Sequence, residues 1–161
     1  MKGKTVIADA STLIGLLRIG QLSLLEKLFG KIIIPKGVYD EVAVERKEGS
    51  DVFKKSPFFI VKNVEDRVSI GFLMPSFGKG EAEVLALAKE EKADLILLDE
   101  KRARKTARRA EFKVMGILGI LVMSKSKGFI SSVKPFIEEL NRQGFRLSEK
   151  VIKRTLKEAG E

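Results

Sequence analysis

The 161-residue chain contains no cysteine and no histidine. These absences exclude disulfide bonds, thiol nucleophiles, imidazole bases, serine triads and the usual zinc sites. Any catalysis must therefore use carboxylates, hydroxyls, lysine or arginine. A domain of this length buries roughly 70% of the surface of its unfolded chain and needs no covalent staples. We therefore expect a single domain that is held together by its own apolar core.

Long apolar stretches are also missing. The longest apolar run, at residues 117–123, is far shorter than the ~18 residues that a membrane-spanning helix requires. The N-terminus carries no basic and apolar targeting pattern. We expect a soluble, cytoplasmic protein without a membrane partner.

Charge is unevenly distributed along the chain, whose net charge is +9. Residues 1–100 contain 15 Lys and Arg against 16 Asp and Glu, whereas residues 101–161 contain 16 against 6. The C-terminal third therefore carries the whole positive excess. A basic face of this kind recruits polyanions, most commonly nucleic acid, with an acidic membrane surface or an acidic protein as competitors.

Residues 5–17 have the pattern of a buried strand that leads directly into a helix. The apolar run Val6–Ala8 stops at Asp9, and an amphipathic leucine and isoleucine pattern follows Ser11. In open α/β sheets, ligands bind beyond the carboxyl ends of the strands, so Asp9 is placed at the mouth of a site. Taken alone, this aspartate is better explained as a cap that accepts a backbone N–H of the helix.

A second predicted strand ends in the same way, because the apolar run Leu95–Leu98 leads straight into Asp99. Two strands that both end in a carboxylate need a common cause, which the capping of one helix does not supply. We therefore predict that Asp9 and Asp99 belong to one functional site.

The rest of the chain alternates between helical and strand patterns. Helices are expected as a hairpin within residues 10–29, from Pro35 past Val42, from Glu81 to Ala88, after Asp99, and at 117–124, 131–141 and 147–159. Strands are expected at 32–34, at 58–61 on the edge of the sheet, and at 113–116. Residues 46–55 and the stretch after residue 61 are polar and predict no regular element. The alternation with short connections indicates a mainly parallel sheet flanked by helices.

Two further acids, Glu41 and Glu81, stand near the starts of helices that flank this sheet. Glu81 also has a plainer explanation, since an acid in a first turn stabilises the helix dipole. Together with Asp9 and Asp99, the two glutamates would place four carboxylates in one pocket, where repulsion would force at least one to protonate. Mg²⁺ or Mn²⁺ resolves this conflict, because both prefer hard oxygen ligands and activate a bound water for attack on phosphate esters. Ser11 is placed to support a ligand carboxylate or a metal-bound water.

A run of cations follows directly after the second aspartate and Glu100. It comprises Lys101, Arg102, Arg104, Lys105, Arg108 and Arg109. Ala103, Ala107 and Ala110 are spaced i, i+4 and i+7, which predicts the packing face of a helix whose other faces carry the charges. Such a run is commonly a solvated surface, but its position beside Asp99 makes contact with phosphates an equal alternative. The candidate RNA-binding residues are Lys101, Arg102, Arg104, Lys105 and Arg108.

The order of these motifs resembles the PIN domain family. The resemblance rests on D-A-S-x-L-I at 9–14, P-x-x-V-x-x-E at 35–41, G-E-A-E at 80–83 and L-L-D-E-K-R-A-R at 97–104. V-M-G-I-L-G-I-L at 114–121 and G-F-R-L-S at 144–148 extend it over nearly the whole chain. It is similar in particular to the prokaryotic branch of predicted nucleic-acid-binding proteins related to VapC-type toxins.

The resemblance implies a Rossmann-like, three-layer α/β/α sandwich with a mainly parallel central sheet. We expect one PIN-like domain over residues 1–161, with residues 131–161 as a helical C-terminal extension. The family further implies an endoribonuclease that depends on Mg²⁺ or Mn²⁺ and hydrolyses RNA. It also implies a homodimer and, for the toxin branch, an antitoxin protein as partner.

By position, Asp9, Glu41, Glu81 and Asp99 match the four acidic metal ligands of the family, and Ser11 matches the hydroxyl that supports the first of them. Two other positions depart from the resemblance. Leu97 stands where many members carry a small hydroxyl residue, and Ile117 stands where this branch often has threonine.

Two other functions stay open at this point. The missing hydroxyls at Leu97 and Ile117, with the basic C-terminal third, motivate one alternative, a non-catalytic RNA-binding PIN module, for example in RNA processing or ribosome assembly. A receiver-like domain that accepts a phosphoryl group on Asp9 or Asp99 is the third alternative, but it leaves Glu41 and Glu81 without a role.

Overall fold

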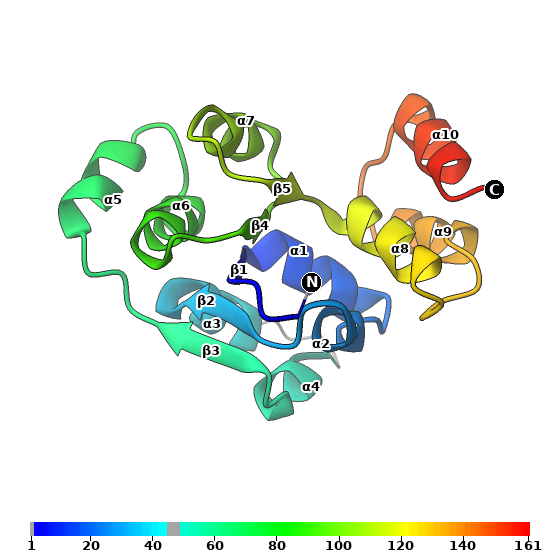
Figure 1. The fold of residues 1–161 in the computed structure, drawn as a ribbon, viewed down its shortest axis with the longest axis horizontal. Coiled ribbons are helices and arrows are strands. Elements are labelled where there is room, and N and C mark those ends of the chain that lie inside the picture. The colour runs from blue at the N-terminus through cyan, green and yellow to red at the C-terminus, as the bar shows by residue number, and fades with distance from the viewer. Residues whose placement is uncertain (1, 45–48) are drawn as a thin grey trace.

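The computed structural model describes residues 2–44 and 49–161. Within them, parallel strands form one sheet in the order β3-β2-β1-β4-β5 (Figure 1). The strands are β1 (Val6–Ala8), β2 (Ile32–Pro35), β3 (Phe59–Lys62), β4 (Leu95–Leu97) and β5 (Val114–Met115). The structure thus confirms the parallel sheet, and it confirms that the strand near residue 60 lies on an edge.

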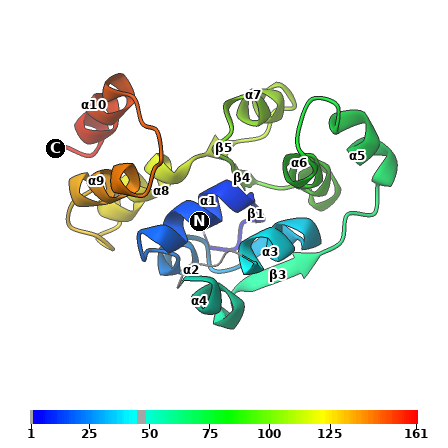
Figure 2. The same cartoon turned by 180° about the vertical axis from the view of Figure 1, so that it is seen from behind.

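Helices precede and follow these strands along the chain. They are α1 (Ala10–Arg18), α2 (Ser23–Phe29), α3 (Lys36–Ala43), α4 (Gly49–Lys55), α5 (Arg67–Leu73), α6 (Lys79–Glu91), α7 (Lys101–Arg109), α8 (Ile117–Ser126), α9 (Lys134–Arg142) and α10 (Glu149–Glu158). Helix α6 packs against β1 and β2, while α3 packs against β2 and β3 (Figures 1 and 2). The arrangement is a PIN-like, three-layer α/β/α fold. No helix in residues 2–44 and 49–161 is long and apolar enough to cross a membrane.

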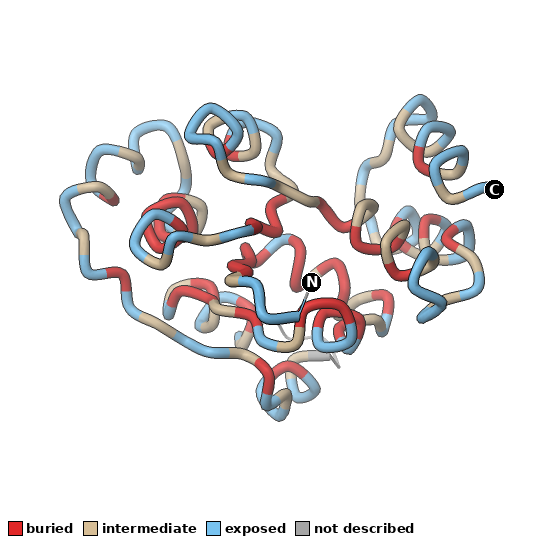
Figure 3. Tube along the Cα trace, in the orientation of Figure 1, coloured by how far each residue is buried: buried red, intermediate tan, exposed pale blue. Residues whose placement is uncertain are grey.

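The two central strands are short apolar runs that are buried along their whole length (Figure 3). Strands of parallel sheets have this composition because helices cover both of their faces. The register pairs Ala8 of β1 with Leu97 of β4, and the backbone N–H of Asp9 donates to the carbonyl oxygen of Leu97 at 2.9 Å. The carboxyl ends of β1 and β4 therefore lie side by side.

The strand order reverses direction between β1 and β4. From β1 the chain proceeds to β2 and β3 on one side, and then returns to place β4 and β5 on the other side. Such a switch point opens a crevice at the carboxyl ends of the two strands, where ligands bind in open α/β sheets. Asp9 directly follows β1 and Asp99 follows β4 by two residues, so both predicted acids stand at this crevice.

Two short helices correct the prediction from the sequence. Helix α4 forms where residues 46–55 predicted no regular element, although residues 46–48 lie outside the described part of the chain. Helix α5 forms in the second polar stretch and is capped by Asp66, which accepts from the backbone N–H of Ser69 at 3.0 Å. Each helix has two turns and buries one large apolar side chain, Phe53 or Ile70. A single buried residue produces no periodicity of apolar residues, so the sequence pattern did not predict these two helices.

The C-terminal third is helical around β5, as the sequence predicted. Helix α8 buries Ile117, Ile120 and Leu121, and α10 packs against it. One detail of α7 was wrong: Ala103 and Ala107 are buried, but Ala110 lies beyond the last turn and is exposed. The division into a domain and a C-terminal extension at residue 131 stays a prediction.

Candidate active site

Asp9 lies buried at the carboxyl end of β1, at the switch point between β1 and β4. The residue is 3% exposed, and its carboxylate caps α1, where it accepts from the backbone N–H of Thr12 at 2.8 Å. Its other oxygen accepts from the backbone N–H of Asp99 at 3.3 Å. Capping and site formation are thus not alternatives, because the same carboxylate caps its helix and contacts the second aspartate.

Asp99 is held from two sides. The hydroxyl of Thr12 donates to Oδ2 at 2.7 Å, and the backbone N–H of Ile117, at the start of α8, donates to Oδ1 at 3.0 Å. These contacts come from helices that follow β1 and β5, the strands on either side of β4. The sheet therefore fixes the position of both carboxylates relative to each other.

Gly116 explains how the end of β5 approaches Asp99 so closely. A Cβ atom at this position would lie 2.6 Å from Oδ1 of Asp99, closer than real side chains come. Any larger residue would push the carboxylate off the N–H of Ile117. Position 117 thus serves the site through its backbone, and the isoleucine side chain packs beside Gly15 of α1.

Burial makes the negative charge of Asp9 costly. The pKa of Asp9 is raised from 3.8 to about 6, and desolvation by burial is the largest cause. The charge of Asp99 also acts to raise this pKa, whereas the hydrogen bonds from Thr12 and from the N–H of Asp99 act to lower it. Neither aspartate forms an ion pair with a Lys or Arg within the described residues. Arg104 nevertheless lies close enough for its charge to interact with that of Asp99. The pair is therefore a concentration of negative charge that is bordered by one arginine but forms no ion pair.

The two predicted glutamates lie on α3 and α6, which pack against each other. A Cβ atom at Gly80 would lie 3.4 Å from Oε2 of Glu41, so Glu41 reaches the first turn of α6. Glu81 instead folds back on its own helix start, where its Oε2 would lie 2.7 Å from a Cβ atom at Gly78. Across residues 2–44 and 49–161, no three Asp or Glu side chains gather closely enough to hold a metal ion. The structure therefore joins Asp9 with Asp99 but does not assemble all four acids.

The predicted RNA-binding residues occupy α7, which begins two residues after Asp99. Lys101, Arg102, Lys105 and Arg108 are exposed, whereas Arg104 is partly buried. Arg102 lies over the ring of Phe77 at 5.8 Å, which directs it towards the loop before α6. Glu100 caps the helix and accepts from the backbone N–H groups of Arg102 and Ala103. The cations thus begin at the crevice and extend away from it.

A family model for the PIN domain matches residues 5–161 of the chain. The protein belongs to the PIN domain family. No curated protein and no solved structure matched the chain. PIN domains are generally nucleases and typically use divalent metals, so the chain has a nuclease-type fold and, at this coarse level, is a hydrolase.

The chemistry of the Asp9 and Asp99 pair fits the divalent metal that PIN domains typically use. The pair offers only carboxylate oxygens, which are the ligands that Mg²⁺ and Mn²⁺ prefer. Mg²⁺ commonly binds through one or two carboxylates and completes its shell with water and substrate phosphates. Two aspartates that form no ion pair within the described residues are compatible with this mode of binding.

Thr12 is a site residue that the sequence did not suggest. Ser11 is exposed and its hydroxyl forms no hydrogen bond within the described residues, whereas Thr12 is fully buried and bonds to both aspartates. A signal was present, because Thr12 is a hydroxyl residue on the otherwise apolar face of α1. The supporting role of Ser11 stays a prediction.

Glu83 is a buried acid on α6 for which the sequence did not suggest a role. It accepts from the backbone N–H of Gly37 at 3.2 Å, and its Oε1 lies 3.9 Å from both Arg67 and Lys79. Because Gly37 is in the first turn of α3, this carboxylate ties α6 to the helix that carries Glu41.

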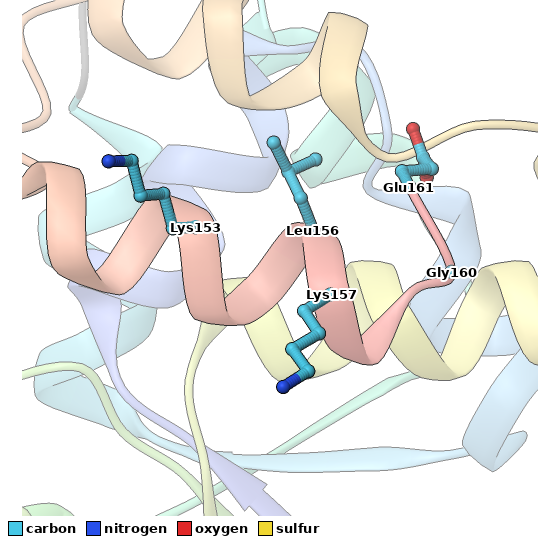
Figure 4. Close-up of a pocket in the computed structure, with 5 residues that line it drawn as sticks. All are labelled: Lys153, Leu156, Lys157, Gly160 and Glu161. Carbon is cyan, nitrogen blue, oxygen red and sulfur yellow. The ribbon is translucent and has the colours of Figure 1, made fainter.

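The surface hollow drawn in Figure 4 lies away from these acids. It is lined by Lys153, Leu156, Lys157, Gly160 and Glu161 at the end of α10. None of the predicted acidic or RNA-binding residues lines it, so we base no function on this hollow.

Proposed function

We propose that this PIN domain is a divalent-metal-dependent endoribonuclease. The observation that carries the proposal is the pairing of the buried Asp9 with the partly buried Asp99 at the switch point of the sheet. A basic helix that begins beside the pair supports RNA as the substrate, because Lys and Arg bind the phosphate backbone without regard to sequence.

Asp9 and Asp99 would hold the metal, with Glu41 and Glu81 as the candidates to complete the set. When bound, such an ion polarises a phosphodiester and lowers the pKa of a water that attacks it. Thr12 and the N–H of Ile117 hold the carboxylate of Asp99 in one orientation, as residues behind metal ligands generally do. The cations of α7 offset the charge of the RNA and keep its backbone near the aspartates.

The resemblance to VapC-type toxins supports a more specific form of the proposal. In this form the protein is the toxin of a toxin–antitoxin pair, acts as a homodimer, and is inhibited by an antitoxin protein. Its test is growth arrest on expression in a bacterial host, with the Asp9→Asn variant as the control that should not arrest growth.

A second candidate is a non-catalytic RNA-binding PIN module. The orientation of Glu81, which faces its own helix start, favours this alternative because it leaves the acid set incomplete. Such a module would bind RNA equally well in EDTA and in Mg²⁺, and would never cleave it.

The deciding experiment incubates a mixed-sequence single-stranded RNA with the protein in EDTA, Mg²⁺ or Mn²⁺. Asp9→Asn and Asp99→Asn are tested beside Asp51→Asn, which changes an exposed aspartate of α4 in the same way. Cleavage that needs the metal, persists in Asp51→Asn and disappears in the other two supports the nuclease. Binding without cleavage under every condition supports the second candidate.

A further inference from the structure

Helix α3 begins without a cap of its own. Its N-cap residue is Pro35, which has no side-chain oxygen, and its first turn contains no acidic residue. The first N–H groups of a helix have no partner within the helix and are often satisfied by the side chain of the N-cap residue. An acceptor for the start of α3 therefore has to come from outside this helix.

Glu83 of α6 supplies such an acceptor. Its Oε2 accepts from the backbone N–H of Gly37, the second residue of α3, at 3.2 Å. A Cβ atom at Gly37 would lie 2.5 Å from the same oxygen, so a larger residue would displace the carboxylate from this N–H. The side chain of Glu83 is 6% exposed, and the helix dipole favours a negative charge at an N-terminus. Glu83 thus caps α3 from a different helix.

A second contact joins the same two helices, which pack against each other (Figure 2), in the opposite direction. Glu41 of α3 reaches α6, where its Oε2 would lie 3.4 Å from a Cβ atom at Gly80. Glu41 follows Gly37 by four residues and Gly80 precedes Glu83 by three, which is about one turn in each helix. The Glu83 contact therefore lies about one turn away from the point where Glu41 meets α6.

Two cations border the carboxylate of Glu83. Arg67 of α5 and Lys79 of α6 each lie 3.9 Å from Oε1, and the side chains of both are mostly exposed. These cations offset the charge of Glu83 at one oxygen, whereas the other oxygen bonds to α3. Asp9 and Asp99 differ in this respect, because they form no ion pair within the described residues. The surroundings of Glu83 suit a residue that holds helices together better than they suit a metal ligand.

We propose that Glu83 is a positioning residue for the metal site and that it acts through Glu41. The inference rests on the proposed function, in which Glu41 is a candidate to complete the metal set of Asp9 and Asp99. The contact of Glu83 with Gly37 fixes the start of α3 against α6. Without that contact the start of α3 can move, so metal binding has to restrict more orientations of Glu41.

The test measures Mn²⁺ affinity without catalysis, by isothermal titration calorimetry of the RNA-free protein. Glu83→Ala should weaken Mn²⁺ binding about tenfold, as for residues that support metal ligands. Glu83→Gln keeps an acceptor oxygen for the N–H of Gly37 and should recover most of this affinity. Glu83→Asp keeps the charge but is one methylene shorter, so it should lower Mn²⁺ affinity as Glu83→Ala does. It takes the place of Glu83→Ala if that variant does not fold.

Glu90→Ala is the matched control. Glu90 lies near the other end of α6 and accepts from the backbone N–H groups of Glu65 and Asp66 at 2.9 and 2.6 Å. The control thus removes the same kind of contact from the same helix, far along the helix from Glu41. It should lower the urea denaturation midpoint without changing Mn²⁺ affinity.

A double-mutant cycle tests the route through Glu41. In a Glu41→Ala background, Glu83→Ala should change Mn²⁺ affinity by less than about twofold, because the ligand that it positions is already missing. An equal loss with and without Glu41 would overturn this route.

The outcomes separate this inference from the proposed function. Unchanged Mn²⁺ affinity in Glu83→Ala, or an equal loss in Glu90→Ala, would overturn the positioning role alone. Absence of Mn²⁺ binding by the unaltered protein would overturn both proposals. A selective loss in Glu83→Ala, in a protein that cleaves no RNA in Mg²⁺ or Mn²⁺, would support the positioning role and reject the nuclease.

Discussion

The acids that follow strands and the acids on helices are held very differently in this PIN domain. Asp9 and Asp99 are held by hydrogen bonds from backbone N–H groups, and Asp99 also by the hydroxyl of Thr12. Glu41 is exposed on α3, and Glu81 faces the start of its own helix. Both kinds of acid were predicted to belong to one site, yet the structure joins only the strand pair.

The difference shows how a parallel sheet builds a site. Neighbouring strands are hydrogen-bonded in a fixed register, so residues at their carboxyl ends have a fixed separation. A glutamate on a flanking helix has a longer side chain and more rotamers to restrict before it reaches the same point. A bound metal ion would supply the electrostatic attraction that draws Glu41 and Glu81 towards Asp9 and Asp99.

The largest expected effect contrasts the two kinds of acid directly. Asp9→Asn and Asp99→Asn should each lower the rate of RNA cleavage roughly 1,000-fold, because several kcal/mol of transition-state stabilisation depend on the metal they hold. Glu41→Gln and Glu81→Gln should cost about tenfold each, as for ligands that tune metal affinity. Single-turnover cleavage in Mn²⁺ measures both. Equal losses in all four variants would contradict the comparison.

The second prediction concerns the stability of the metal-free protein. The folded-state pKa of Asp9 is raised from 3.8 to about 6, so between these values the folded protein binds more protons than the unfolded chain. Its contribution to stability should therefore fall as the pH rises through this window, by at most about 3 kcal/mol. Urea unfolding in EDTA at several pH values measures it.

Asp9→Asn is the control for this pH dependence. The amide does not titrate, so the fall in stability between pH 3.8 and about 6 that is due to Asp9 should be missing. If the stability of the variant falls with pH as that of the unaltered protein does, other titratable groups cause the fall.

A third prediction separates the two hydroxyls of α1. Thr12→Val should lower cleavage about tenfold, because Asp99 loses a charge-assisted hydrogen bond of 2.7 Å and with it a fixed orientation. Ser11→Ala should leave cleavage nearly unchanged if the exposed hydroxyl makes no further contact in the metal-bound state. RNA cleavage assays of both variants measure the two effects. A larger loss in Ser11→Ala would instead support the supporting role predicted for it from the sequence.

The smallest expected effect compares the two glutamates of α6. Glu83→Ala should destabilise the protein by about 1 kcal/mol, since it removes the acceptor for the N–H of Gly37. Glu81→Ala should change stability by less, because the side chain of Glu81 folds back on the start of α6 and does not link that helix to another element. Urea denaturation midpoints measure both, and Glu83→Gln should restore most of the loss by keeping an acceptor oxygen.

Much of the fold was predictable because it depends on local pattern. The buried runs before Asp9 and Asp99 are strands, the hairpin within residues 10–29 forms α1 and α2, and Ser148 opens the last helix, whose start the pattern placed at residue 147. Helices α4 and α5 were missed because their stability comes from single buried side chains that contact distant elements. The spacing of apolar residues along the chain does not reveal such contacts.

The candidate site was predictable in part for the same reason. Aspartates at positions 9 and 99 favour metal binding or acid–base catalysis over other chemistry. The absence of histidine and cysteine narrows the possible functions further. The hydroxyl of Thr12 on an apolar helix face was a signal, but its partner Asp99 lies 87 residues away and the partner of Glu83 lies 46 residues away, so these contacts could not be assigned from the sequence.

The sequence by itself determined the alternation of strands and helices, the carboxylates at two strand ends, and the basic character of the C-terminal third. Each of these depends on the order of residue types over a few turns or strand positions. Only the tertiary structure decided that β4 returns to pair with β1, which puts the two aspartates in contact. It alone also decided that α10 packs against α8, because no pattern within α10 specifies that partner.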